Sequence, residues 1–152
     1  MILLVRHGSA GDRESWVDDD SQRPLDQKGR HQADGLVGIF APYRITQILS
    51  SRYLRCVQTV EPLAEARGIT VHEVKWLEEA RDPDYALRQL LQCQGEGLVA
   101  CSHGDVIAGI LLTLTDSVEA IGASPAMKKG STWCLDTHQG KVVNATYLDV
   151  PS

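Results

Sequence analysis

The chain has 152 residues, 43% of them hydrophobic, and a formal net charge of −5. This length is typical of one globular domain, and we expect residues 1–152 to form a single one. The acidic balance disfavours nucleic acid and membrane surfaces as partners, since both recruit basic faces. The longest apolar stretch, 106–114, is too short to cross a bilayer. We expect no leader segment, because the chain opens directly on an apolar run that predicts a strand. The four cysteines lack the spacing of disulfide pairs or metal ligands. We therefore expect a soluble, cytoplasmic protein with reduced thiols.

The predicted elements alternate between strands and helices. An apolar run predicts a strand at 2–6, and a polar loop at 9–25 then leads to a helix that begins after Asp26 and ends near Phe40. The later strands are predicted at 45–49, 69–74, 97–101, 131–136 and 142–148. The later helices are predicted from about 53 to 68, from 82 to 93 and from 105 to 114.

Two local signals refine this pattern. Pro62 is expected to end or kink the second helix, because proline removes a helical hydrogen bond. Gln139-Gly140 is expected to be the turn of a hairpin between the last two strands. Alternating strands and helices predict an α/β fold, a three-layer α/β/α sandwich with a mainly parallel central sheet.

Three of the predicted strands end in polar residues. The first ends in Arg6-His7-Gly8 and the fourth in Ser102-His103-Gly104. The second passes through Ser50-Ser51 into a helix whose first turn carries Arg55. Because the carboxyl ends of parallel strands meet at one crevice, these side chains are expected to converge. Guanidinium groups match phosphate oxygens and histidine can attack phosphorus, so the sequence predicts a phosphate-handling site.

At these residues the chain resembles the histidine phosphatase superfamily, also called the phosphoglycerate mutase-like proteins. The resemblance covers nearly the whole chain. The segments that carry it, in order, are Arg6-His7-Gly8; Arg23-Pro24-Leu25 with Gly29 and Gln32-Ala33; Ser50-Ser51 with Leu54-Arg55 and Gln58-Thr59; and Ser102-His103-Gly104. The short chain is most similar to the small phosphohistidine phosphatase branch. It is also similar to the phosphatase domain that follows a Nudix hydrolase domain in some actinobacterial proteins.

The resemblance implies roles for the catalytic residues. His7 is the nucleophile that becomes phosphorylated, and Arg6, Arg55 and His103 hold the phosphoryl group. For attack His7 must be neutral, and we expect nearby arginines to lower its pKa and a backbone carbonyl to fix its tautomer. Glu79 is the first candidate for the acid that protonates the leaving group.

For several further residues the sequence leaves more than one role open. Glu78 is the second candidate acid, and a phosphohistidine substrate needs such an acid less. The candidate substrate-binding residues are Gly8, Ser9, Arg23 and Gly104, and for Arg23 an anchoring role in the loop before the first helix is an equal alternative.

No cofactor and no metal are expected, because two guanidinium groups and a second imidazole can neutralise the phosphoryl charge. The run Asp18-Asp19-Asp20 lacks calcium-site spacing and is interpreted as a solvated edge of the loop. The leading hypothesis is a metal-independent phosphatase acting on a phosphorylated small molecule or a phosphohistidine protein. The alternatives are a phosphotransferase or mutase of the same superfamily, and a module that recognises phosphate without turnover. The substrate and the oligomeric state are left open.

Overall fold

The computed structural model describes residues 1–93 and 95–152. The strands are β1 (Ile2–Arg6), β2 (Gln47–Ser50), β3 (Val71–Glu73), β4 (Leu98–Ser102), β5 (Thr132–His138) and β6 (Lys141–Leu148). The helices are α1 (Gln27–Ile39), α2 (Leu54–Arg67), α3 (Pro83–Gln92) and α4 (Gly104–Leu114), with short 3₁₀ turns at Arg13–Ser15, Asp20–Gln22, Lys75–Leu77 and Glu119–Ile121. The strands form one six-stranded sheet in the order β3-β2-β4-β1-β5-β6.

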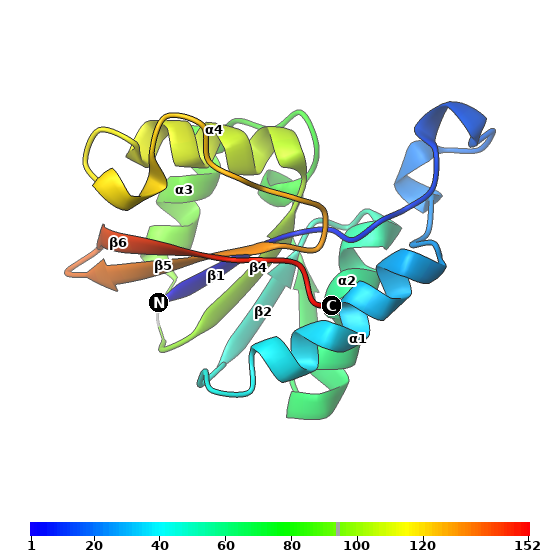
Figure 1. Ribbon diagram of the computed structural model, residues 1–152, viewed down its shortest axis with the longest axis horizontal. Coiled ribbons are helices and arrows are strands. Elements are labelled where there is room, and N and C mark those ends of the chain that lie inside the picture. The colour runs from blue at the N-terminus through cyan, green and yellow to red at the C-terminus, as the bar shows by residue number, and fades with distance from the viewer. Residues whose placement is uncertain (94) are drawn as a thin grey trace.

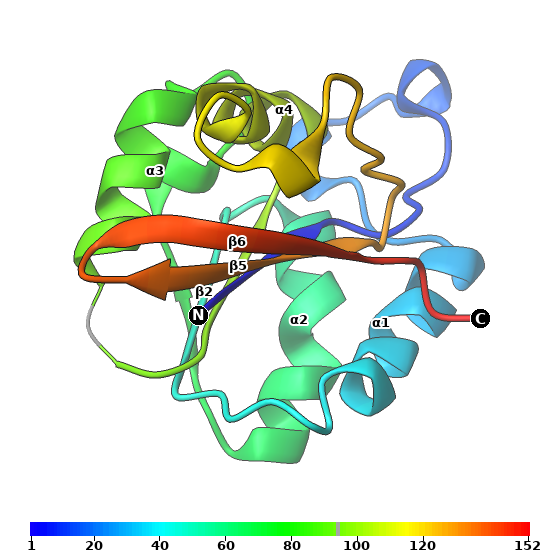
Figure 2. The same cartoon turned by 60° about the vertical axis from the view of Figure 1, so that its left-hand side comes forward.

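Helices cover both faces of this sheet. Figures 1 and 2 show α3 and α4 on one side and α1 and α2 on the other. In β1, Leu4 faces the α3/α4 layer while Leu3 and Val5 face the α1/α2 layer, because successive side chains of a strand point to opposite faces. A strand buried on both faces is apolar throughout, which explains the continuous run at the N-terminus. The predicted three-layer sandwich is confirmed. No helix in the described ranges combines the length and apolarity needed to cross a membrane.

The sheet is parallel where the site lies and antiparallel at its far edge. β1 and β2 both pair in parallel with β4, whereas β5 runs antiparallel to β1 and β6 antiparallel to β5. The hairpin between β5 and β6 turns at Gln139 and Gly140, whose φ angles are 51° and 74°, as the tightest hairpin turns require. The predicted hairpin is therefore confirmed.

Two local predictions need correction. Of the two effects expected at Pro62, an end of the helix is wrong: α2 continues to Arg67, and Gly68 in the left-handed conformation terminates it where the sequence predicts the stop. Leu63 and Ala64 are buried against the core there, and this packing outweighs the hydrogen bond that the proline removes. The loop at 9–25 is not irregular throughout, because Asp12 and Asp19 cap its two 3₁₀ turns through their side chains.

Candidate active site

The carboxyl ends of β1, β2 and β4 meet at one edge of the sheet. In the register of the β1/β4 pair Arg6 lies opposite Ser102, and the His7 N–H donates to the Ser102 carbonyl at 3.1 Å. His7 and His103 therefore leave neighbouring strands at the same level, and their ring centroids are 5.4 Å apart in an edge-to-face arrangement. The predicted convergence of the two His-Gly segments is what the parallel pairing produces.

His7 is held as a neutral imidazole with a defined tautomer. Its side chain is buried, and Nδ1 lies 2.8 Å from the Gly8 carbonyl oxygen. A carbonyl only accepts, so Nδ1 donates and Nε2 keeps its lone pair. Burial lowers the pKa of His7 to about 3, and repulsion from a protonated His103 and from the charges of Arg55 and Arg6 acts in the same direction, against the hydrogen bond to Gly8. The expected hydrogen bond is present, but burial rather than the arginines is the main cause of the lowered pKa.

The loop after His7 is fastened to the helices below it. The Gly8 N–H donates to Thr59 Oγ1 at 3.0 Å, and the Ser9 N–H donates to Gln32 Oε1 at 2.9 Å. The Ser9 hydroxyl donates to Asp26 Oδ2 at 2.7 Å. Gly8 and Ser9, which the sequence analysis treated as substrate contacts, thus use these polar groups to anchor the loop.

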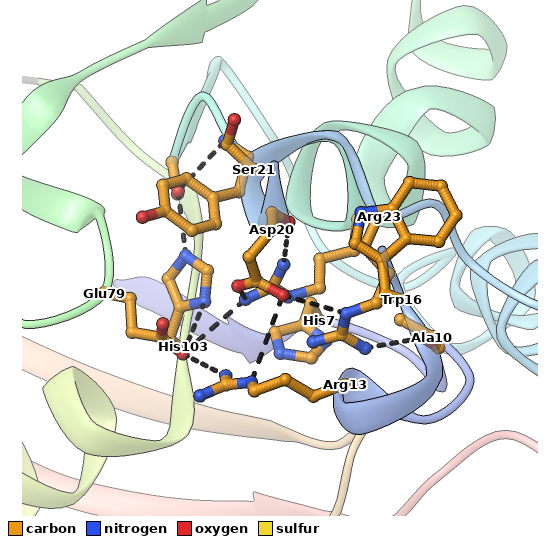
Figure 3. Close-up of polar contacts among 12 residues, drawn as sticks. His7, Ala10, Arg13, Trp16, Asp20, Ser21, Arg23, Glu79 and His103 are labelled. Carbon is orange, nitrogen blue, oxygen red and sulfur yellow. Dashed lines mark hydrogen bonds and ion pairs between the residues drawn. The ribbon is translucent and has the colours of Figure 1, made fainter. Parts of the chain in front are cut away.

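Arg55 is buried completely at the start of α2, with its guanidinium 5.0 Å from the centre of the Tyr53 ring. Its two terminal nitrogens donate to Asp20, one to the backbone carbonyl at 2.9 Å and one to Oδ2 at 3.0 Å. Arg23 Nε donates to Asp20 Oδ1, also at 3.0 Å. One carboxylate therefore joins two guanidinium groups of the site, as Figure 3 shows for Asp20 and Arg23.

The prediction that residues 18–20 are a solvated edge is wrong for Asp20. Burial raises the pKa of its carboxyl, but hydrogen bonds and charges from Arg23 and Arg55 outweigh burial, so the pKa lies below its usual value and the group is ionised. Asp18 is exposed, as expected. The spacing of Asp20 and Arg23, three residues apart, was the available signal, because such neighbours meet across one helical turn.

The second histidine and one of the candidate acids face each other. His103 is 1% exposed, and its Nδ1 lies 4.0 Å from Glu79 Oε1. The same oxygen accepts a hydrogen bond from Arg13 and lies 3.5 Å from Arg55 NH2. Glu78 points elsewhere: it is buried and pairs with Arg52 at 2.9 Å. Of the two candidate acids, only Glu79 lies in the cleft.

Arg6 lies against the start of α4. Its NH1 donates to the Met127 carbonyl at 2.8 Å, and burial lowers the pKa of its guanidinium. A Cβ atom on Gly104 would lie 3.0 Å from Arg6 Cζ, so any other residue there would shift the guanidinium by a few tenths of an ångström. Gly104 therefore lets the backbone of α4 lie directly on the guanidinium.

Several of these groups border a cleft of about 810 Å³, whereas the buried Arg55 and His103 are not part of its lining. Its lining contains the predicted residues Arg6, His7, Arg23, Glu79 and Gly104. It also contains Gly11, Asp12, Arg13, Glu14, Asp105, Ala108, Met127 and Lys129, which the sequence analysis did not assign to the site. Arg13 and Glu14 reach the cleft because the loop after β1 folds into 3₁₀ turns. Such short turns have no periodic pattern of apolar residues, so the sequence does not predict them.

The fold and this site together define a histidine phosphatase domain. Residues 2–85 match the family model described as the histidine phosphatase superfamily, branch 1, and the chain belongs to that superfamily. It is 36% identical over 155 residues to the 8-oxo-(d)GTP phosphatase of Mycolicibacterium smegmatis, a match that covers 99% of this chain and 48% of that protein. The chain therefore spans about half the length of this relative.

Solved structures show the same fold. The putative phosphohistidine phosphatase SixA from Agrobacterium tumefaciens superimposes with a TM-score of 0.77 at 21% identity, over 97% of this chain and 95% of that one. A mycobacterial glucosyl-3-phosphoglycerate phosphatase does so with a TM-score of 0.70 at 18% identity, over 99% of both chains. The family resemblance stated from the sequence is thus confirmed.

Proposed function

We propose that this chain hydrolyses phosphate esters or phosphohistidine without a metal, through a phosphohistidine intermediate on His7. The observation that carries the proposal is the state of His7, a buried neutral imidazole whose Nδ1–H is bonded to Gly8 and whose Nε2 lone pair is free. A nucleophilic histidine needs this tautomer and this protonation state. Two guanidinium groups and a second imidazole lie beside it.

In the first step His7 Nε2 forms a bond to phosphorus while the bond from phosphorus to the leaving oxygen or nitrogen breaks. The phosphorylated ring carries a positive charge, which the Gly8 carbonyl stabilises through Nδ1–H. Glu79 in its protonated form gives a proton to an alkoxide leaving group, a contribution of about 10²–10⁴-fold in rate where such a proton is needed.

In the second step water attacks phosphorus, the P–N bond breaks and His7 becomes neutral again. The proton lost by the water passes to the Glu79 carboxylate, which restores the acid. Arg6, Arg55 and His103 stabilise the charge on the equatorial oxygens in both steps. Because Asp20 Oδ2 accepts a hydrogen bond from Arg55 NH2, a phosphoryl group that binds at this nitrogen competes with the carboxylate.

The test compares the parent with His7→Ala on an aryl phosphate in excess EDTA. Activity that survives the chelator and disappears in the variant supports the proposal, and acid-labile, alkali-stable phosphate trapped on the parent during turnover supports the intermediate. His31→Ala is the matched control, because His31 is an exposed histidine on α1, outside the lining of the cleft. Activity that the chelator abolishes, or that persists in His7→Ala, would refute the mechanism.

For the substrate class we infer a phosphorylated nucleotide as the first to test, since the 36% identical relative is named for the hydrolysis of a nucleotide. A panel of nucleoside phosphates, phosphosugars and a phosphohistidine peptide, compared by kcat/KM, distinguishes the candidate classes. A nucleoside phosphate that is not the best substrate in the panel would contradict the inference.

A further inference from the structure

The second histidine has one ring nitrogen against the protein and the other toward the cleft. His103 Nε2 lies 2.9 Å from Ser51 Oγ. Its Nδ1 is buried and, among the described residues, has no hydrogen-bond partner. A neutral imidazole carries its proton on only one nitrogen. The tautomer therefore decides whether the cleft is offered a hydrogen-bond donor or a lone pair.

Hydrogen-bond counting at Ser51 selects one tautomer. Ser51 is 0% exposed, and its Oγ accepts the Tyr53 backbone N–H at 3.2 Å. The hydroxyl has one proton to donate, and within residues 1–93 and 95–152 the acceptor in reach is His103 Nε2. If Nε2 were protonated, the hydroxyl proton of Ser51 would be buried without an acceptor, which is unfavourable because a buried donor loses its hydrogen bonds to water.

The neighbouring thiol does not alter this count. Cys56 Sγ lies 3.5 Å from the same ring nitrogen and is a weak donor and a weak acceptor. Were Nε2–H to donate to Cys56 instead, the Ser51 proton would still lack an acceptor. Every arrangement with a proton on Nε2 leaves both that buried hydroxyl and the Nδ1 lone pair unsatisfied, whereas a proton on Nδ1 leaves only the Nδ1–H without a hydrogen-bond partner among the described residues.

The opposite side of the ring favours the same tautomer independently. Nδ1 faces the carboxylate of Glu79 at 4.0 Å. Before substrate binds, Glu79 is the carboxylate that pairs with Arg13, so a proton on Nδ1 is attracted to that oxygen, whereas a lone pair there would be repelled by it. Two different neighbours of His103, a hydroxyl behind the ring and a carboxylate in front of it, thus both place the proton on Nδ1.

We propose that Ser51 is a positioning residue that holds neutral His103 as the Nδ1–H tautomer. His103 then offers an N–H to the phosphoryl oxygens without first taking up a proton. This use of the N–H rests on the proposed function, but the tautomer itself does not. Ser51 is the second residue of the Ser50-Ser51 pair that carries part of the family resemblance, and its hydroxyl thus has a physical role, fixing the tautomer of His103.

The decisive measurement is a long-range ¹H–¹⁵N correlation spectrum of the histidine rings in the resting chain of residues 1–152, with His103→Gln used to assign the signals. We expect a protonated Nδ1 and an unprotonated, hydrogen-bonded Nε2 for neutral His103. A protonated Nε2 would overturn the proposal. Because the spectrum needs no turnover, a correct tautomer in an inactive protein would refute the proposed function alone.

Two serine variants test the role of the hydroxyl. Ser51→Ala is expected to remove the hydrogen bond at Nε2, to weaken the preference for Nδ1–H, which then depends on Glu79 alone, and to lower kcat about tenfold, the effect of losing one net hydrogen bond. Ser50→Ala is the matched control, since it deletes an equally buried hydroxyl that donates to the Ser51 carbonyl and not to the ring. Unchanged His103 signals in Ser51→Ala would overturn the assignment, and where that variant does not fold the parent spectrum still decides.

Discussion

Asp20 is expected to compete with phosphate, and Asp20→Asn tests this directly. The carboxylate makes two hydrogen bonds of 3.0 Å, to Arg23 and Arg55, and the substitution keeps the shape while removing the charge. Hydrogen bonds to charged groups contribute about 1.5–3 kcal/mol each when they are buried. The Asp20 side chain is 34% exposed, so solvent screens these contacts and we discount the loss to about 1.4 kcal/mol in total. This corresponds to about tenfold tighter binding of inorganic phosphate.

The assay is calorimetric titration of inorganic phosphate into each protein in EDTA at pH 7, with the product-inhibition constant as a second measurement. Asp18→Asn is the matched control, because it changes the net charge equally in the same loop while Asp18 is exposed. The control corrects for the general effect of removing one negative charge from an acidic protein. Phosphate binding that is unchanged or weaker in Asp20→Asn, relative to Asp18→Asn, would refute the argument that the carboxylate occupies the anion site.

Three further predictions concern the acid, the anchoring loop and the nucleophile. Glu79→Gln should lower kcat on an alkyl phosphate by about 10²-fold or more and affect an aryl phosphate less. Glu78→Gln is the control and should leave the ratio of alkyl to aryl kcat unchanged. Equal ratios in both variants would exclude Glu79 as the acid. Gly29→Ala places a Cβ 1.9 Å from the Ser9 carbonyl oxygen and should cost about 2–3 kcal/mol of unfolding free energy and most of the activity. In the same helix Gly38→Ala meets nothing within 4 Å and should stabilise by about 0.5 kcal/mol in urea unfolding, and equal effects of both would contradict this account. The pKa of His7 is lowered from 6.5 to about 3 on folding, so its contribution to stability is complete above pH 6.5 and is lost as the pH falls toward 3. Between pH 6.5 and 5 the parent should therefore lose about 2 kcal/mol of unfolding free energy that His7→Ala retains; parallel curves for the two proteins would show that the histidine is not buried in its neutral form.

Much of the fold follows from short-range patterns. The apolar run of β1, the cap at Asp26 and the turn at Gln139-Gly140 each name a local structure whose cause lies within a few residues. The position of His7 beside His103 was also predictable, because the carboxyl ends of neighbouring parallel strands meet at one edge of the sheet. Where a prediction was wrong, at Pro62, burial of the following residues outweighed the local preference.

The sequence by itself determined the order of strands and helices and the family, and it predicted that Arg6, His7, Arg55 and His103 meet at one edge of the sheet, because each of these depends on local periodicity or on residue type at a strand end. The tertiary structure alone decided which carboxylates meet those residues. Glu78 and Glu79 are adjacent in the chain, yet one pairs with Arg52 and the other faces His103. Likewise Asp20 lies in a run of three aspartates, and only the folded loop brings it between Arg23 and Arg55. Charge pairing depends on distances of a few ångströms between distant segments, and such distances are set by packing rather than by local pattern.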